Sequence, residues 1–333
     1  MITSTRAFDR RAVQIVVLLA WSAGCAQAPV RTTPRAGETP LLRRTEAAPV
    51  ASAPPRAPFT FVAEDFEGDS PKFTATDASG VEWKVKLGPE AQTETAAGAL
   101  LAAAGYYVEQ MHYLADVPVD GVAGMKRGRD FIAANGLVRG ARFELRPADA
   151  ERGPNWDWRA NPFVGTEALD GLRVLMVLIN NYDARTTNNR VMFVEGPSGR
   201  RETRYVVTDL GASFGRYGGL GGRRSKGDLE GYRASRFIER VAGGVVQFSY
   251  RTRPEGLGLS LFVLNPFYVD GELKKQRDLN RVPVEHVRWI ARVLSHIDRA
   301  AISGAFERAG FGPELTAGFS AVVEDRIRAL SGV

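Results

Sequence analysis

Five residues of the chain have the side chains that phosphoryl transfer requires, and they follow one another in this order: Lys86, Glu94, Asp183, Asn188 and Asp209. A triphosphate needs a fixed cation, and that cation needs a carboxylate to hold it. Mg²⁺ needs oxygen ligands, and an attacking hydroxyl needs a proton acceptor. We therefore predict that Lys86 binds the phosphates and that Glu94 holds Lys86. Asp183 is the candidate base, and Asp209 and Asn188 are the candidate Mg²⁺ ligands, Asp209 the principal one.

Two of these assignments have a close rival in the sequence. Lys84 lies two residues before Lys86, and alternate residues of a strand point to the same face. Glu90 lies four residues before Glu94 and shares its side of a helix. Ordinary structural roles are a further alternative, because Lys86 and Glu90 can form an exposed ion pair and loop Asp or Asn residues often cap turns.

A short glycine-containing segment, 68–72, precedes the predicted lysine strand and reads Gly-Asp-Ser-Pro-Lys. Backbone N–H groups and one lysine at this place could cover bound phosphates. Ser70 and Lys72 are therefore added to the candidate ATP-binding residues. A plain surface turn is the alternative, since the chain has no complete Gly-x-Gly-x-x-Gly motif.

The elements that must position these residues fall into two groups. The first group is rich in strand patterns: the expected elements are a hairpin of strands 72–76 and 81–87, a helix that Pro89 opens and Gly105 closes, and strands 106–114 and 141–145. This group predicts a β-rich N-lobe with one helix over residues 59–146.

The second group places the acidic residues in loops between regular elements. It consists of a buried helix over 167–181, a polar loop over 180–189, strands 191–194 and 205–208 that end at Asp209-Leu210-Gly211, and a helical tail over 282–333. We expect a mainly helical C-lobe over 147–333. The predicted fold class is α+β, with the two lobes of a protein-kinase-like fold.

In the order of these residues and elements, the sequence resembles the atypical kinases. This group includes the secreted Golgi-type protein kinases, the bacterial persistence-toxin kinases and the phosphoinositide kinases. The resemblance covers roughly residues 72–215 and is carried by Leu-Ile-Asn-Asn-Tyr-Asp at 178–183 and Asp-Leu-Gly-Ala-Ser-Phe-Gly at 209–215. It implies a phosphotransferase that uses ATP and Mg²⁺ on a protein or small-molecule acceptor. The chain departs from the pattern at Ala184-Arg185, where such kinases usually have Arg-His.

The N-terminus predicts export and lipidation. Three arginines precede an apolar run at 12–20, and Ser-Ala-Gly-Cys at 22–25 resembles a bacterial lipobox. Residues 1–25 are therefore predicted to be a lipoprotein signal peptide with lipidation at Cys25, and residues 26–58, rich in Ala and Pro, a disordered tether. An ordinary secretory signal cut near Ala28 is the alternative. These features predict a lipid-anchored membrane protein of the bacterial cell envelope that faces the periplasm or the exterior. The stretch at 84–94 also resembles an uncharacterised bacterial lipoprotein family.

Composition excludes several other classes. Cys25 is the only cysteine, so an intramolecular disulfide and a multi-cysteine zinc site are excluded. The formal net charge is +6, but Lys and Arg are scattered, so we expect no nucleic-acid partner. An exported protein meets little ATP, and a catalytically inactive kinase-like binding or scaffold lipoprotein is therefore the alternative function.

Overall fold

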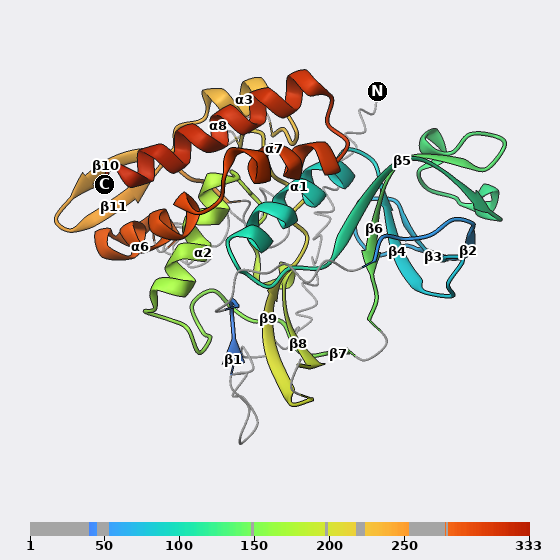
Figure 1. Cartoon of the computed structure of the whole chain (residues 1–333), viewed down its shortest axis with the longest axis horizontal. Coiled ribbons are helices and arrows are strands. Elements are labelled where there is room, and N and C mark those ends of the chain that lie inside the picture. Colours follow the sequence, from blue (N-terminus) through green and yellow to red (C-terminus); the bar gives the residue numbers. More distant parts are fainter. Residues whose placement is uncertain are drawn as a thin grey trace, which may run out of the picture.

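The computed structural model describes residues 40–44, 53–147, 150–196, 199–217, 224–252, 277 and 279–333. The predicted signal peptide and Cys25 lie outside the described residues. The chain has a mixed α+β architecture, as the sequence predicts, with a β-barrel at one side and a larger, helix-rich part at the other (Figure 1). Within the described ranges, no helix is long and apolar enough to cross a membrane.

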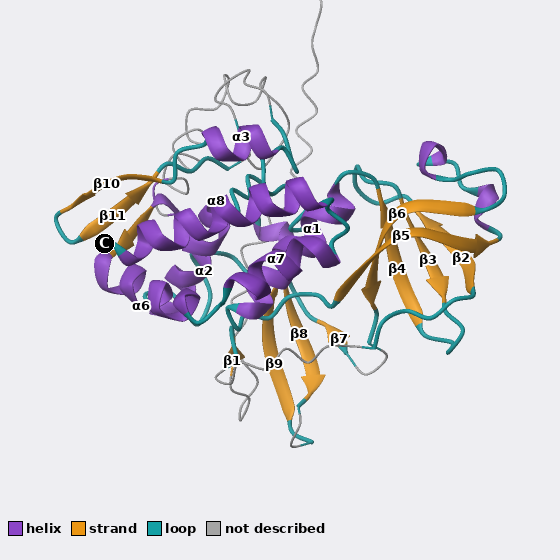
Figure 2. Ribbon diagram, turned by 45° about the horizontal axis from the view of Figure 1, so that its top comes forward, coloured by secondary structure: helices purple, strands orange, loops and turns teal. Residues whose placement is uncertain are grey.

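A closed five-stranded barrel forms the first part of the chain (Figure 2). The strands, in barrel order, are β2 (Phe59–Asp65), β3 (Lys72–Thr76), β4 (Glu82–Leu87), β6 (Leu137–Leu145) and β5 (Met111–Asp120). Neighbours are antiparallel except for the closing pair β2 and β5, which is parallel. The predicted hairpin of 72–76 and 81–87 is thus present as β3 and β4.

Alternation along β3 and β4 separates an apolar interior from a charged exterior. Phe73, Val85 and Phe143 are fully buried inside the barrel. Lys86 lies on the opposite face, because successive strand residues point to opposite sides. In the sheet register it stands between Lys72 of β3 and Arg142 of β6.

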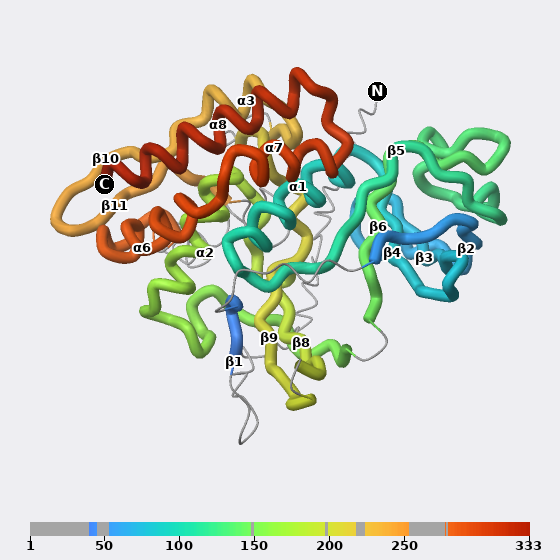
Figure 3. Tube along the Cα trace, in the orientation of Figure 1, coloured from blue at the N-terminus to red at the C-terminus, as the bar shows by residue number. Residues whose placement is uncertain are grey.

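Helix α1 (Glu90–Ala103) follows β4 directly and joins the barrel to the rest of the protein. Gly88 in the connection has a φ of 92°, a conformation that glycine adopts without strain. The apolar side of α1, including Ala97 and Leu101, belongs to the large core of the helix-rich part. Figure 3 shows the trace leaving the barrel into α1, which runs beside α7, and returning into β5.

The larger part contains five described α-helices and two small sheets. The helices are α2 (Glu167–Leu178), α3 (Leu229–Ala234), α6 (Val284–Ser295), α7 (Arg299–Arg308) and α8 (Pro313–Ser331). One sheet has the order β1 (Pro40–Leu41), β9 (Arg201–Val207), β8 (Asn189–Glu195), β7 (Glu151–Arg152), and the other is β10 (Ile238–Ala242), β11 (Val245–Phe248), β12 (Arg281–Pro283). Three short 3-10 helices complete the described elements: Val122–Gly124, Arg129–Phe131 and Thr186–Asn188.

The predicted tether does not hold for residues 40–44. Strand β1 pairs in parallel with β9, and Leu42 is buried in the large core. Arg43 donates a hydrogen bond to the Ala104 carbonyl at 3.1 Å and lies over the Trp289 ring. The buried leucine and the hydrogen-bonded arginine offset the entropy lost when this short stretch is ordered. The Pro- and Ala-rich composition of the surrounding residues gave no sign of these contacts.

Candidate functional site

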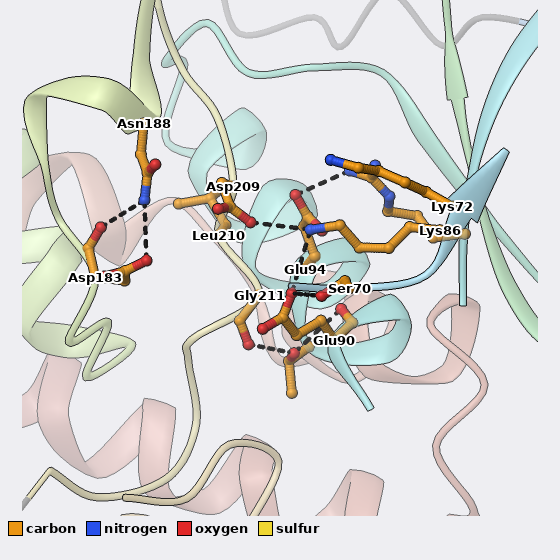
Figure 4. A network of polar contacts seen from close by, with 12 residues as sticks. Ser70, Lys72, Lys86, Glu90, Glu94, Asp183, Asn188, Asp209, Leu210 and Gly211 are labelled. Carbon is orange, nitrogen blue, oxygen red and sulfur yellow. Dashed lines mark hydrogen bonds and ion pairs between the residues drawn. The ribbon is translucent and has the colours of Figure 1, made fainter. Parts of the chain in front are cut away.

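Lys86 lies among three carboxylates at the junction of the barrel, α1 and the segment after β9 (Figure 4). Its Nζ is 2.8 Å from Glu94 Oε2, 2.9 Å from Asp209 Oδ1 and 3.3 Å from Glu90 Oε2. The side chain is nearly inaccessible, with 6% of the residue exposed. Lys84 instead approaches Asp65 at 3.9 Å. The geometry therefore places Lys86, and not its rival, in contact with both α1 and Asp209, which is 123 residues away.

The charge on Lys86 is fixed by its partners. Burial acts to lower the pKa of the ammonium group, but attraction to Glu94, Asp209 and Glu90 outweighs burial and raises the pKa above its ordinary value. Lys86 therefore stays protonated throughout the physiological range. A permanently charged, immobilised ammonium group is what the binding of a phosphate requires.

Glu94 is held from its other side by Arg142, a residue that the sequence pattern did not single out. Arg142 Nη1 lies 2.9 Å from Glu94 Oε1, and Nη2 donates to Glu144 Oε2 at 2.7 Å. Glu94 and Arg142 are each 1% exposed. The alternation of Arg142 and Glu144 within the predicted strand 141–145 was the available signal, because it places two opposite charges on the face that carries Lys86.

Glu90 has a different environment from Glu94, although both reach Lys86. It accepts a hydrogen bond from Ser70 Oγ at 2.7 Å and pairs with Lys226. Burial would raise its pKa, but Lys86, Lys226 and Ser70 together lower the pKa of Glu90 to about 2. The segment that contains Ser70 is thus fastened to α1.

Lys72 lies on β3 opposite Lys86, and its ammonium group is 3.8 Å from Asp65.

Asp209 follows the end of β9 in a left-handed backbone conformation, with a φ of 53°. This turn leaves its side chain 43% exposed while one oxygen contacts Lys86. Gly211 lets α1 come close, because a Cβ at this position would lie 2.7 Å from Glu90 Cβ. Thr93 of α1 also donates to the Gly211 carbonyl at 2.6 Å. The glycine of the Asp-x-Gly segment is therefore required by the packing of α1.

Asp183 and Asn188 are joined within one loop. Asn188 Nδ2 donates to the Asp183 carbonyl at 2.7 Å and lies 3.3 Å from Asp183 Oδ2. Arg185 Nη2 pairs with the same Oδ2 at 2.7 Å. Asp183 Oδ1 is buried and accepts no hydrogen bond from the described residues. A carboxylate oxygen that accepts no hydrogen bond has the lone pairs to take a proton.

Backbone hydrogen bonds connect this loop to the segment around Asp209. The bonds run from Thr208 N to Asn188 O at 2.9 Å, from Tyr182 N to Ala212 O at 3.2 Å and from Phe214 N to Ile179 O at 2.8 Å. Figure 4 shows Asp209 between the Asp183–Asn188 pair and the Lys86–Glu94 pair. The five predicted residues therefore form two groups at one junction. Lys86, Glu94 and Asp209 form one group, Asp183 and Asn188 form the other, and backbone hydrogen bonds connect the two.

The oxygen atoms of Asp209 and Asn188 suit Mg²⁺, although they do not form a complete metal site by themselves. Among the described residues, no group of three or more His, Cys, Asp or Glu could hold a metal ion. Mg²⁺ is commonly held by one or two protein oxygens together with phosphate oxygens and water. Asp209 and Asn188 would supply such oxygens.

Several solved structures are similar to this chain, among them two crystal structures. One is the crystal structure of CtkA, a proinflammatory kinase of Helicobacter pylori, with 11% identity, 82% of this chain and 96% of that chain covered, and a TM-score of 0.45. The other is the crystal structure of the golgi casein kinase, with 11% identity, 83% and 76% covered, and a TM-score of 0.32. No family model and no curated protein matches the sequence. Both neighbours are kinases by name.

Proposed function

We propose that the protein is a Mg²⁺-dependent phosphotransferase that uses ATP. The observation that carries this proposal is the position of Lys86 Nζ, which contacts Glu94 on α1 and Asp209 after β9 at 2.8 and 2.9 Å. A cation fixed beside an exposed carboxylate supports the joint binding of phosphate and metal.

Each residue has a defined part in this proposal. Lys86 holds the phosphates of the donor, and Glu94 keeps Lys86 in place. Asp209 and Asn188 would hold Mg²⁺, which supplies charge neutralisation on the transferred phosphoryl group. Asp183 accepts the proton of the attacking hydroxyl at Oδ1. The acceptor is a protein or a small molecule that bears a hydroxyl group.

Two contacts favour a second candidate, a kinase-like protein that binds a phosphorylated ligand without transferring phosphate. Asp183 Oδ2 is already paired with Arg185, and Asp209 Oδ1 is already paired with Lys86. Asp183 Oδ1, the oxygen without a partner, is buried, so the carboxylate has to turn towards a substrate before it takes a proton. Asp209 has to release Lys86 before both of its oxygens can bind a metal ion. A binding protein needs no such exchange.

Thermal unfolding of the full-length protein with and without MgATP tests the proposal. At 100 times the dissociation constant, bound ligand adds about 2.7 kcal/mol to the free energy of unfolding. Asp209→Ala should abolish this shift, whereas Asp116→Ala, an exposed carboxylate on β5, should retain it. Transfer of labelled phosphate from ATP to an acceptor separates the enzyme from the binding protein. Absence of any shift with nucleotide or Mg²⁺ would contradict ATP binding.

We further propose that the protein is exported and anchored in the bacterial cell envelope through a lipid on Cys25. The support is the sequence alone: a basic start, a short apolar run and a small-residue segment that ends at the only cysteine. Cys25→Ser should move the protein from the membrane fraction to the soluble fraction. Unchanged fractionation would contradict the lipid anchor.

A further inference from the structure

Two lysines, Lys72 and Lys84, lie beside Lys86. Lys84 has no role in the function proposed so far, and Lys72 enters it only as part of the 68–72 segment. Lys72 stands directly opposite Lys86 in the β3–β4 register, and Lys84 lies two residues before Lys86 on the same face. Both ammonium groups approach one carboxylate oxygen, Asp65 Oδ2, at 3.8 and 3.9 Å. Within the described part of the chain, neither group has a partner at hydrogen-bonding distance.

These two cations are poorly neutralised for their degree of burial. Their side chains are only 13% and 17% exposed, and Asp65 is the carboxylate that both approach. Lys84 also faces Glu144 across the β4–β6 register, but Glu144 is bound by Arg142 at 2.7 Å. Burial, followed by repulsion from Lys84, lowers the pKa of Lys72, and Lys86 adds to the repulsion. An anion placed between these ammonium groups would relieve the repulsion and supply the missing hydrogen bonds.

The segment before Lys72 is held by hydrogen bonds from Arg127. Arg127 donates to the carbonyls of Gly68 and Ser70, each at 2.8 Å. Gly68 has a φ of 64°, and a Cβ at this position would lie 3.7 Å from Lys72 Nζ. The turn at Gly68 therefore lies close to Lys72, and Arg127 holds its backbone.

We propose that Lys72 and Lys84 form a second anion subsite next to Lys86, and that the site binds a chain of condensed phosphates along the β3–β4 face. This inference deepens the proposed phosphotransfer and rests on it. Purine bases are usually held by apolar walls, whereas Lys72 and Lys84 flank Lys86 on this face. Arg142, on the other side of Lys86, is buried against Glu94 and Glu144 and takes no part in the subsite. Recognition therefore comes from the phosphate chain, and inorganic polyphosphate serves as a donor.

The transfer step balances without a further reactant. The oxygen of the acceptor hydroxyl bonds to the terminal phosphorus, and the bond from that phosphorus to the bridging oxygen breaks. The bridging oxygen keeps the electron pair, and the chain leaves shortened by one phosphate. The hydroxyl proton passes to Asp183.

Calorimetric titration of the full-length protein with inorganic tripolyphosphate and with ATP, both with Mg²⁺, tests the inference. We expect tripolyphosphate to bind at least as tightly as ATP. Lys72→Met and Lys84→Met keep the alkyl stems and should each weaken tripolyphosphate binding by about tenfold, the loss typical of one charge-assisted contact. Lys84→Arg should restore most of the affinity. Lys126→Met removes an exposed lysine from the same part of the protein and should change nothing.

The outcomes separate the inference from the function on which it rests. If ATP binds and transfers phosphate but tripolyphosphate does not compete with it, or if Lys84→Met leaves binding unchanged in a folded protein, the subsite is overturned and the phosphotransferase remains. If tripolyphosphate binds as expected but transfers no phosphate while ATP does, the subsite stands and the claim that polyphosphate is a donor is overturned. If neither compound binds, both proposals fail.

Discussion

The two groups of residues in the site differ in how far apart their members lie in the sequence. The Lys86–Glu94–Asp209 group joins residues from a strand, a helix and a distant segment, and two of its members are almost completely buried. The Asp183–Asn188 pair lies within one loop, and the two residues are five positions apart. The first group contributes to the fold as well as to ligand binding, whereas the second is formed by local hydrogen bonds. Substitutions in the two groups should therefore affect stability and activity to different extents.

The largest effect on activity is expected in the local pair. Asp183→Asn removes the proton acceptor but keeps the shape of the side chain and the bond from Asn188 to the backbone carbonyl. Loss of a general base should lower the turnover of phosphate transfer by about 10²- to 10⁴-fold. MgATP should still raise the melting temperature. A steady-state assay with Asp116→Asn as the matched control measures this, and retained turnover would exclude Asp183 as the base.

The largest effect on stability is expected in the buried group. Arg142→Ala leaves Glu94 and Glu144 without their common partner, and loss of one member of a buried ion pair costs about 3–5 kcal/mol. Arg139→Ala removes an exposed arginine from the same strand and should change the free energy of unfolding by less than about 0.5 kcal/mol. Urea denaturation compares the two variants. Equal stabilities would show that the buried network does not support the fold.

A smaller, pH-dependent effect is expected at Glu90, which connects the buried group to Ser70 and Lys226. The pKa of Glu90 is lowered from 4.5 to about 2 in the folded protein. Its ionised form therefore contributes stability that is complete above about pH 4.5 and is lost as the pH falls towards 2. Glu90→Gln should cost about 2 to 3 kcal/mol at neutral pH.

The difference between wild type and Glu90→Gln should shrink as the pH falls from 5 towards 2. Thermal melts of both proteins across this range measure it. Glu82→Gln, an exposed glutamate on β4, is the control. A difference that stays constant with pH would show that the Glu90 carboxylate has the same pKa in the folded and unfolded chain.

Much of the local structure around the site was predictable from sequence patterns. The hairpin of β3 and β4, the helix after it, the buried helix α2 and the strands before Asp209 all appear near the predicted positions. Strands β10 and β11 were not predicted. Four of the five residues of β10 are exposed, so its sequence lacks the alternation that marks a half-buried strand. The C-lobe is consequently less purely helical than expected.

The contact between β1 and β9 and the parallel closure of the barrel by β2 and β5 were also missed. Both pairings connect segments far apart in the chain. A short strand carries no sequence signal for a distant partner, because its register depends on which faces the completed core leaves available.

The sequence by itself determined which chemical groups are present and their order, because the periods of helix and strand assign each side chain to a face. Two pairs of rivals shared a face, and the period could not separate Lys84 from Lys86 or Glu90 from Glu94. Only the tertiary structure decided that Lys86 contacts Asp209 and that Arg142 holds Glu94. Such contacts depend on how α1 packs against the barrel and the segment after β9, and this packing is a property of the whole folded chain.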